Sequence, residues 1–128
     1  MRLLLDTHAL LWWLAGNANR LSATARDAIA NETHSIHVSA ASVWEIATKT
    51  RLGKLDANAL IGRMNAVISE QTFMALPISV DHAERAGALP GEHKDPFDRM
   101  LIAQAQAENM TLVSNEVAFD SYGVRRIW

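Results

Sequence analysis

The 128-residue sequence contains no cysteine and no long hydrophobic run, and its formal net charge is only −2. The absence of cysteine excludes a disulfide scaffold and any cysteine-bound zinc or iron–sulfur site, and it is compatible with the reducing cytoplasm in which we expect the protein to act. The leucine run before Asp6 is too short for a signal peptide, and no stretch approaches the roughly 18 apolar residues that would cross a membrane. The small charge argues against binding nucleic acid by bulk charge alone, but it leaves open a nuclease whose acidic site holds a metal.

The composition is that of a folded globular protein. Hydrophobic residues make up 49% and charged residues 20% of the chain, which excludes a disordered polymer. A chain of this length corresponds to about one domain, so we expect residues 1–128 to form a single domain.

Short apolar segments alternate with segments of helical periodicity along the whole chain. Strands are expected over residues 2–5, 35–38, 72–76, 111–113 and 124–127. Helices are expected over residues 7–15, 22–31, 57–70, 79–87 and 96–109, and from Ser39 or Ser42 to about residue 51. This alternation predicts a three-layer α/β domain, with a central, mainly parallel sheet of about five short strands flanked by helices.

Two acidic residues follow predicted strands directly. Asp6 comes after the first strand, and Glu116 comes after the fourth, behind Ser114 and Asn115. Each has an ordinary explanation, Asp6 as a helix N-cap and Glu116 as a first-turn acid. However, ligands of open α/β sheets bind at the carboxyl ends of the strands, and both acids would lie at that edge.

A third acid lies at the start of the helix predicted over 96–109. Asp95 is a natural N-cap and Pro96 suits the first helical position. Asp98 then falls within roughly 60° of Leu101 on a helical wheel, and so faces the apolar side. It either satisfies first-turn N–H groups or projects into a polar pocket in the core.

A fourth acid, Glu45, has the strongest ordinary explanation. It lies opposite the apolar side of its helix, next to Ser42 and four residues before Lys49. A Glu–Lys pair on a solvated face would explain it, and the alternative places this polar face at the rim of a cleft. Tryptophans 12, 13 and 44 occur among apolar residues at helical spacing, which favours core packing or a subunit interface over base stacking.

Several carboxylates at one sheet edge would repel one another without a counter-ion, and all-oxygen sites favour Mg²⁺ or Mn²⁺. Other chemistries lack their signatures. The sequence has no His-Glu-x-x-His motif, no glycine-rich phosphate loop and no Gly-x-Ser-x-Gly turn. An aspartyl-phosphate phosphatase that uses Asp6 is a weaker alternative, because His8 stands where related phosphatases carry a second aspartate.

Over essentially its whole length the chain resembles the PIN-domain ribonucleases, and among them the VapC-like toxins of type II toxin–antitoxin systems. The most specific match is the Asp-Pro-Phe-Asp-Arg stretch at 95–99. The matching segments are 4–8, 39–47, 52–55, 93–105, 112–114 and 122–124.

The resemblance implies an Mg²⁺- or Mn²⁺-dependent endoribonuclease that hydrolyses RNA phosphodiester bonds with metal-activated water. The catalytic and metal-binding acids would be Asp6, Glu45, Asp98 and Glu116, with Asp6 and Asp98 as the principal metal contacts; the family usually has aspartate where Glu116 stands. Thr7 and Ser114 could orient water or the carboxylates. Candidates for contacting phosphates or balancing the acids are Lys49, Arg51, Lys54 and Arg99.

The resemblance also implies partners. These would be an RNA substrate and an antitoxin that inserts a segment into the acidic cleft, with operator DNA bound only through the antitoxin. A homodimer is expected and a membrane is not. The alternative to a nuclease is a PIN-fold binding module with a weak site that acts through its antitoxin.

Overall fold

The computed structural model describes residues 1–17 and 19–128. The small and polar residues 16–19 predict a loop, of which Ala18 lies outside the described residues. The strands are β1 (Arg2–Leu5), β2 (Ser35–Ser39), β3 (Met74–Leu76), β4 (Thr111–Val113) and β5 (Arg126–Ile127). The helices are α1 (Thr7–Leu14), α2 (Ala23–Ala30), α3 (Ala40–Arg51), α4 (Met64–Glu70), α5 (Val80–Ala88) and α6 (Pro96–Glu108), with a 3-10 helix η1 (Val117–Tyr122).

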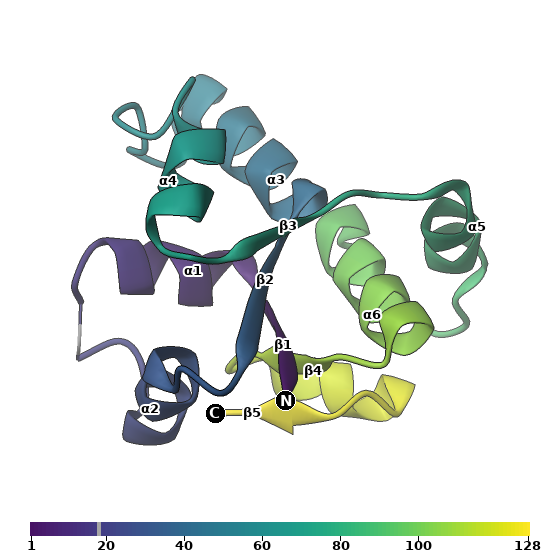
Figure 1. Ribbon diagram of the computed structural model, residues 1–128. Coiled ribbons are helices and arrows are strands. Elements are labelled where there is room, and N and C mark those ends of the chain that lie inside the picture. The colour runs from purple at the N-terminus through teal and green to yellow at the C-terminus, as the bar shows by residue number, and fades with distance from the viewer. Residues whose placement is uncertain (18) are drawn as a thin grey trace.

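The sheet has five strands in the order β3-β2-β1-β4-β5, and every pairing is parallel. The first strand of the chain is therefore the central one, with Leu5 opposite Val38 of β2 on one side and Val113 of β4 on the other. Helices flank the sheet, with α5 and α6 together on one side of it (Figure 1). The predicted three-layer α/β architecture is confirmed.

The alternation of side chains along β1 divides the core in two. Leu3 and Leu5 are buried on one face, in a cluster with residues of α1, α2, α3 and α4. Leu4 is buried on the other face with Leu101, Ile102 and other residues of α6, β4 and η1. Because both faces of β1 are covered, its uninterrupted run of leucines is the pattern expected of a central parallel strand.

One helix is much shorter than its sequence pattern predicts. The expected helix over 57–70 begins only at Met64, and residues before it form turns with hydrogen bonds such as Leu60 N to Ala57 O (3.0 Å). Gly62 has a φ of +84°, a left-handed conformation that ends regular helix geometry. The glycine decides the start of α4, whereas the apolar periodicity alone predicts one continuous helix.

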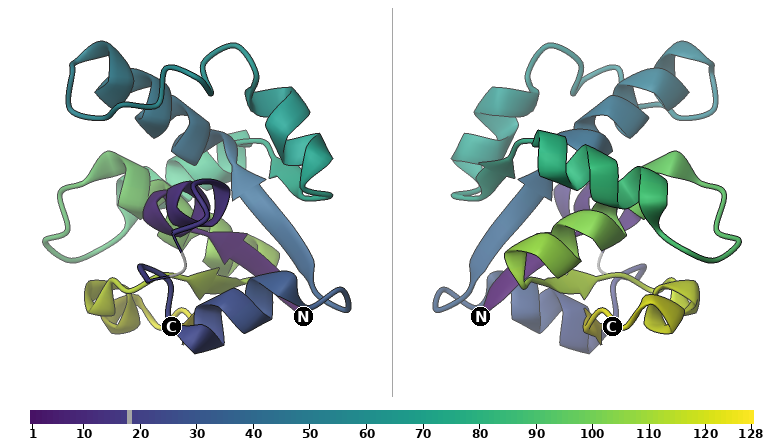
Figure 2. Two further views of the ribbon diagram at one scale, coloured as in Figure 1. Left: turned by 90° about the vertical axis from the view of Figure 1, so that its left-hand side faces the viewer. Right: turned by 90° about the vertical axis from the view of Figure 1, so that its right-hand side faces the viewer.

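The parallel strands end at a common edge, where the following segments turn into helices. Figure 2 shows α1 starting at the tip of β1, in views turned by 90° from Figure 1. No helix in the described part of the chain is long and apolar enough to span a membrane.

Candidate active site

Asp6 links the central strand to its helix. Its backbone N–H donates to Val113 O (3.1 Å), and its Oδ1 accepts from Ala9 N (2.7 Å) as the N-cap of α1. The side chain also bonds to the Ser114 hydroxyl at the end of the neighbouring strand β4. Burial raises the pKa of Asp6, although these hydrogen bonds oppose the rise. The predicted cap is confirmed, and the same carboxylate is a buried charge at the sheet edge.

Glu45 lies in the interior and not on a solvated face. It is 4% exposed, and its Oε1 accepts from Thr7 Oγ1 (2.5 Å) while its Oε2 pairs with Lys49 Nζ (2.5 Å). The predicted Glu–Lys pair is present, but the helix is turned so that Ser42 and Glu45 face inward, while Trp44 is 60% exposed. Core packing is therefore wrong for Trp44, whereas a subunit interface, the other role expected of it, stays a prediction. The prediction oriented the helix by its apolar residues. Hydrogen bonds to Thr7 instead stabilise a polar face that is turned inward.

Asp98 stands in the first turn of α6, aimed by the residues before it. Asp95 caps the helix by accepting from Phe97 N (2.9 Å) and Asp98 N (3.2 Å), and Pro96 occupies the first turn. The Asp98 side chain is 21% exposed, and its Oδ2 lies 3.1 Å from Nε2 of His93. Asp95 therefore caps the helix, and Asp98 provides the inward-facing carboxylate.

The acids influence one another electrostatically. Burial, together with the negative charges of Asp95, Glu45 and Glu116, raises the pKa of Asp98 to about 7, while His93 opposes the rise. The negative charge of Glu116 likewise raises the pKa of Asp6. Such mutual effects place acids from four chain segments in one electrostatic neighbourhood at the carboxyl edge of the sheet.

Glu116 differs from the other three acids. It is exposed, it caps the start of η1 without a side-chain hydrogen bond, and its backbone N–H donates to Ser114 Oγ (2.9 Å). The Ser114 hydroxyl therefore connects the backbone of Glu116 to the carboxylate of Asp6. Nothing among the described residues fixes the Glu116 side chain.

The donor chemistry of this cluster fits a divalent cation, because carboxylates dominate it and two of them have raised pKa values. However, the described side chains are not oriented around a common ion. Within residues 1–17 and 19–128, no group of three acidic or histidine side chains is arranged to hold one ion. Each buried acid faces a protein partner instead: Asp6 the Ala9 N–H, Glu45 Thr7 and Lys49, and Asp98 His93.

The arginine and lysine side chains predicted to contact phosphate or balance the acids differ in their surroundings. The guanidinium of Arg99 donates to the carbonyls of Ala86 (3.0 Å), His93 (3.0 Å) and Leu89 (2.6 Å). Arg99 therefore holds the α5–α6 loop through backbone carbonyls, and its role in contacting phosphate or balancing the acids stays a prediction. Arg51 and Lys54 are exposed, with no side-chain hydrogen bond to any described residue.

His93 is a residue that sequence reasoning did not assign, although it belongs to the quoted 93–105 stretch. It contacts Asp98 through its ring and Arg99 through its carbonyl. Its position five residues before Asp98, across a predicted loop, gives no periodicity by which it could be found. Only the closed loop brings it to the carboxylate.

The family model described as the PIN domain matches residues 3–124. The chain belongs to the PIN domain family. PIN domains are generally nucleases and generally use divalent metal ions. The acidic cluster at the carboxyl edge of this PIN domain has the chemistry that such a family requires.

Several solved structures share this fold at low sequence identity. VapBC2 from Rickettsia felis, bound to a DNA fragment from its promoter, is 18% identical with a TM-score of 0.66, covering 98% of this chain and 97% of that one. DNA-bound VapBC from Salmonella typhimurium is 16% identical (TM-score 0.68; coverage 98% and 96%). FitAcB from Neisseria gonorrhoeae is 19% identical (TM-score 0.63; coverage 97% and 95%). No curated protein matches the chain.

Proposed function

We propose that residues 1–128 form one PIN domain that is a metal-dependent endoribonuclease, the toxin of a toxin–antitoxin pair. The observation that carries this proposal is the gathering of Asp6, Glu45, Asp98 and Glu116 at the carboxyl edge of the sheet of a PIN domain, where burial and neighbouring acids raise the pKa of Asp98 to about 7. Acids that repel one another favour a cation beside them, and acids with perturbed pKa values are frequent at functional sites. The shared fold with VapBC and FitAcB structures supports the toxin assignment.

Asp6 and Asp98 would be the principal ligands of Mg²⁺ or Mn²⁺, with Glu45 and Glu116 completing the site or positioning water. The bound cation would supply positive charge that polarises the phosphate and lowers the pKa of water. Thr7 holds Glu45, and Ser114 holds Asp6, so both hydroxyls fix the directions of the carboxylates. Lys49, whose side chain is 36% exposed, would turn from Glu45 toward an arriving phosphate.

The proposed partner is an antitoxin that occludes the acidic cleft with a basic side chain, so that its cation stands where the metal would bind. Operator DNA would be bound through the antitoxin, and the PIN domain would form a homodimer. The neighbours described as VapBC bound to promoter DNA and as DNA-bound VapBC support this arrangement. Suppression would be electrostatic, because a buried cation among these acids removes their repulsion.

One experiment tests the activity. The purified chain, free of antitoxin, is incubated with total RNA and Mn²⁺ or Mg²⁺, beside an EDTA control and the Asp98→Asn variant. We expect cleavage with the metal, none in EDTA, and roughly 100-fold slower cleavage by the variant, since even the residues that only support metal ligands cost about 10–100-fold when they are changed. Cleavage that persists in EDTA or in the variant contradicts the proposal.

A second candidate is a PIN-fold binding module that acts through its antitoxin. The exposed, unfixed Glu116 and the protein partners of the other acids favour this alternative. Calorimetry with Mn²⁺ separates the two functions. Absence of both metal binding and RNA cleavage would support the binding module, and metal binding with cleavage would exclude it.

A further inference from the structure

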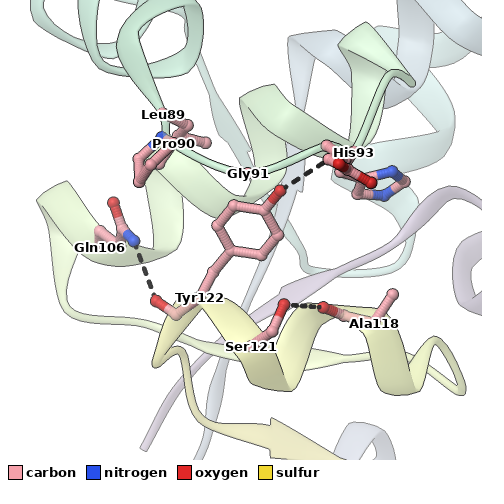
Figure 3. Close-up of a pocket in the computed structure, with 9 residues that line it drawn as sticks. Leu89, Pro90, Gly91, His93, Gln106, Ala118, Ser121 and Tyr122 are labelled. Atoms are coloured by element: carbon pink, nitrogen blue, oxygen red, sulfur yellow. Dashed lines mark hydrogen bonds between the residues drawn. The ribbon is translucent and has the colours of Figure 1, made fainter.

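A cavity of about 640 Å³ opens between the α5–α6 loop, the last turn of α6 and η1. Leu89 and Pro90 form one wall, Gln106 of α6 lies beside them, and Tyr122 of η1 projects into the middle (Figure 3). Its volume lies within the range of small-molecule sites, roughly 300–1,000 Å³. None of the acids at the sheet edge lines it.

The cavity adjoins the acidic cluster through a single shared residue. His93 lines the cavity, donates its backbone N–H to the Tyr122 hydroxyl (3.3 Å), and places its ring 3.1 Å from Asp98. Gln106 is eight residues after Asp98 on α6, roughly 12 Å along the helix axis. A nucleotide in the cavity would therefore be a near neighbour of one whose phosphate lies at Asp98.

The lining offers an aromatic face held at a fixed distance from the loop. A Cβ at Gly91 would approach the Tyr122 hydroxyl to 2.8 Å, so the ring rests directly against the glycine backbone, where φ is +93°. Only glycine adopts this conformation without strain and leaves room for the ring. Aromatic rings held in this way are the surfaces on which unstacked RNA bases pack.

Two exposed hydrogen-bond acceptors at the cavity have no partner among the described residues. Gln106 Nε2 donates to Tyr122 O (3.1 Å), whereas its Oε1 points away from that bond (Figure 3) and accepts nothing from the described residues. The exposed carboxylate of Glu92 also lines the cavity and has no hydrogen-bond partner in the described chain. Two acceptors favour a donor group on the ligand, and a carboxylate disfavours a phosphate.

We propose that this cavity is a nucleobase subsite that takes one unstacked base of single-stranded RNA and prefers bases with an exocyclic amino group over uracil. The inference rests on the proposed ribonuclease function and deepens it, since it assigns sequence preference to Gln106 and Glu92. Tyr122 packs on the base, and the amino group donates to Gln106 Oε1 or to Glu92. The phosphates stay outside, on the side of the acidic cluster.

Binding is tested without cleavage, by ¹H–¹⁵N spectra of the whole chain in EDTA during titration with AMP, CMP, GMP or UMP. We expect the amino-bearing nucleotides to shift the Gln106 side-chain and Gly91 backbone signals, with about tenfold weaker binding of UMP, the worth of roughly one hydrogen bond. Inorganic phosphate should leave these signals in place. The proposal is overturned if no nucleotide shifts them, or if phosphate alone does.

Specificity is tested by sequencing RNA ends produced by three variants. Gln106→Met keeps the length but removes the acceptor, so the preference for amino-bearing bases at one position near the cut should fall about tenfold. Gln106→Glu keeps an acceptor but loses the amide donor to Tyr122 O, and it should retain the preference. If Gln106 acted only through its bond to Tyr122 O, this variant would lose the preference. Thr24→Ala, exposed on α2, is the matched control.

The outcomes distinguish a failure of the proposed subsite from a failure of the proposed ribonuclease function. If the chain cleaves RNA but Gln106→Met keeps the wild-type preference, the subsite is wrong while the nuclease stands. If the chain cleaves no RNA, the nuclease fails, and the nucleotide titration alone then supports or overturns the subsite.

Discussion

Thr7 Oγ1 donates a 2.5 Å hydrogen bond to Glu45 Oε1, which joins the first turn of α1 to the inward face of α3 across 38 positions of sequence. Both residues are about 95% buried. Together with the ion pair to Lys49, the bond explains how the carboxylate of Glu45 can be buried near Asp98. Through this bond, Thr7 holds in place Glu45, a residue of the proposed metal site.

Thr7→Val should therefore destabilise the fold although it preserves the shape of the side chain. A hydrogen bond to a charged group contributes roughly 1.5–3 kcal/mol, and its loss leaves Glu45 with one fewer donor. Chemical denaturation measures the free energy of unfolding. Thr7→Ser, which keeps the hydroxyl, is the control and should lose well under half as much; equal losses for the two variants would refute the role of the bond.

Lys49→Met should also lower stability, by about 1–2 kcal/mol. Lys49 is partly exposed but its partner Glu45 is buried, so the value lies between those of surface and interior ion pairs. The pairing with Glu45 raises the pKa of Lys49, which keeps it charged at any ordinary pH. Lys49→Arg should retain most of the stability in thermal unfolding; if both variants melt like the wild type, the pair contributes nothing.

The raised pKa of Asp98 makes stability fall with rising pH. The folded state holds the proton up to about pH 7, whereas an unfolded aspartate releases it near pH 3.8. Between these values the folded chain binds more protons, so the stabilisation present at low pH is lost as pH rises through 7. Asp98→Asn should raise the free energy of unfolding at pH 8 by on the order of 2 kcal/mol. A rise of about three pKa units would correspond to roughly 4 kcal/mol at about 1.4 kcal/mol per unit, and solvent screening of the partly exposed side chain reduces this value.

The same comparison at pH 4 is the internal control, since Asp98 is then protonated in the folded state and the asparagine has little to relieve. Urea unfolding at the two pH values provides the measurement. A gain that is equal at both would show that the substitution acts by packing and not by charge.

Added Mn²⁺ or Mg²⁺ should raise the melting temperature, and more so at pH 8 than at pH 5. A cation that binds only the folded state adds RT ln(1 + [M]/Kd), which is about 2.7 kcal/mol at a hundredfold excess over Kd. Protonation of Asp98 competes with the metal, and this sets the pH dependence. Asp6→Asn should abolish the shift and Thr24→Ala should not; a shift that survives Asp6→Asn would place the ion elsewhere.

The sequence predicts the fold well because its signals are local and consistent. The leucines before Asp6 mark a central strand, and Asp95 with Pro96 marks the start of α6, as the structure confirms. The start of α4 is missed because a left-handed glycine at 62 outweighs apolar periodicity. A single left-handed residue can set where a helix begins, and apolar periodicity over many residues does not indicate it.

The candidate site is predicted less completely, and for a different reason. Asp6 and Asp98 are found because each contradicts its local pattern, as acids beside apolar residues. Glu45 fits its local pattern and is nevertheless buried, since its partner Thr7 is remote in sequence. His93 and the carbonyl partners of Arg99 depend on how a loop closes, which no periodicity encodes.

The central place of β1 has a consequence for synthesis of the protein. A chain emerging from the ribosome presents Asp6 early, but β1 gains its second neighbour only when Thr111–Val113 has been made. Long-range parallel pairing of this kind is slow to form. The acidic cluster, whose members span residues 6 to 116, is therefore completed only when nearly the whole chain has been made, so that an unfinished chain lacks the candidate site.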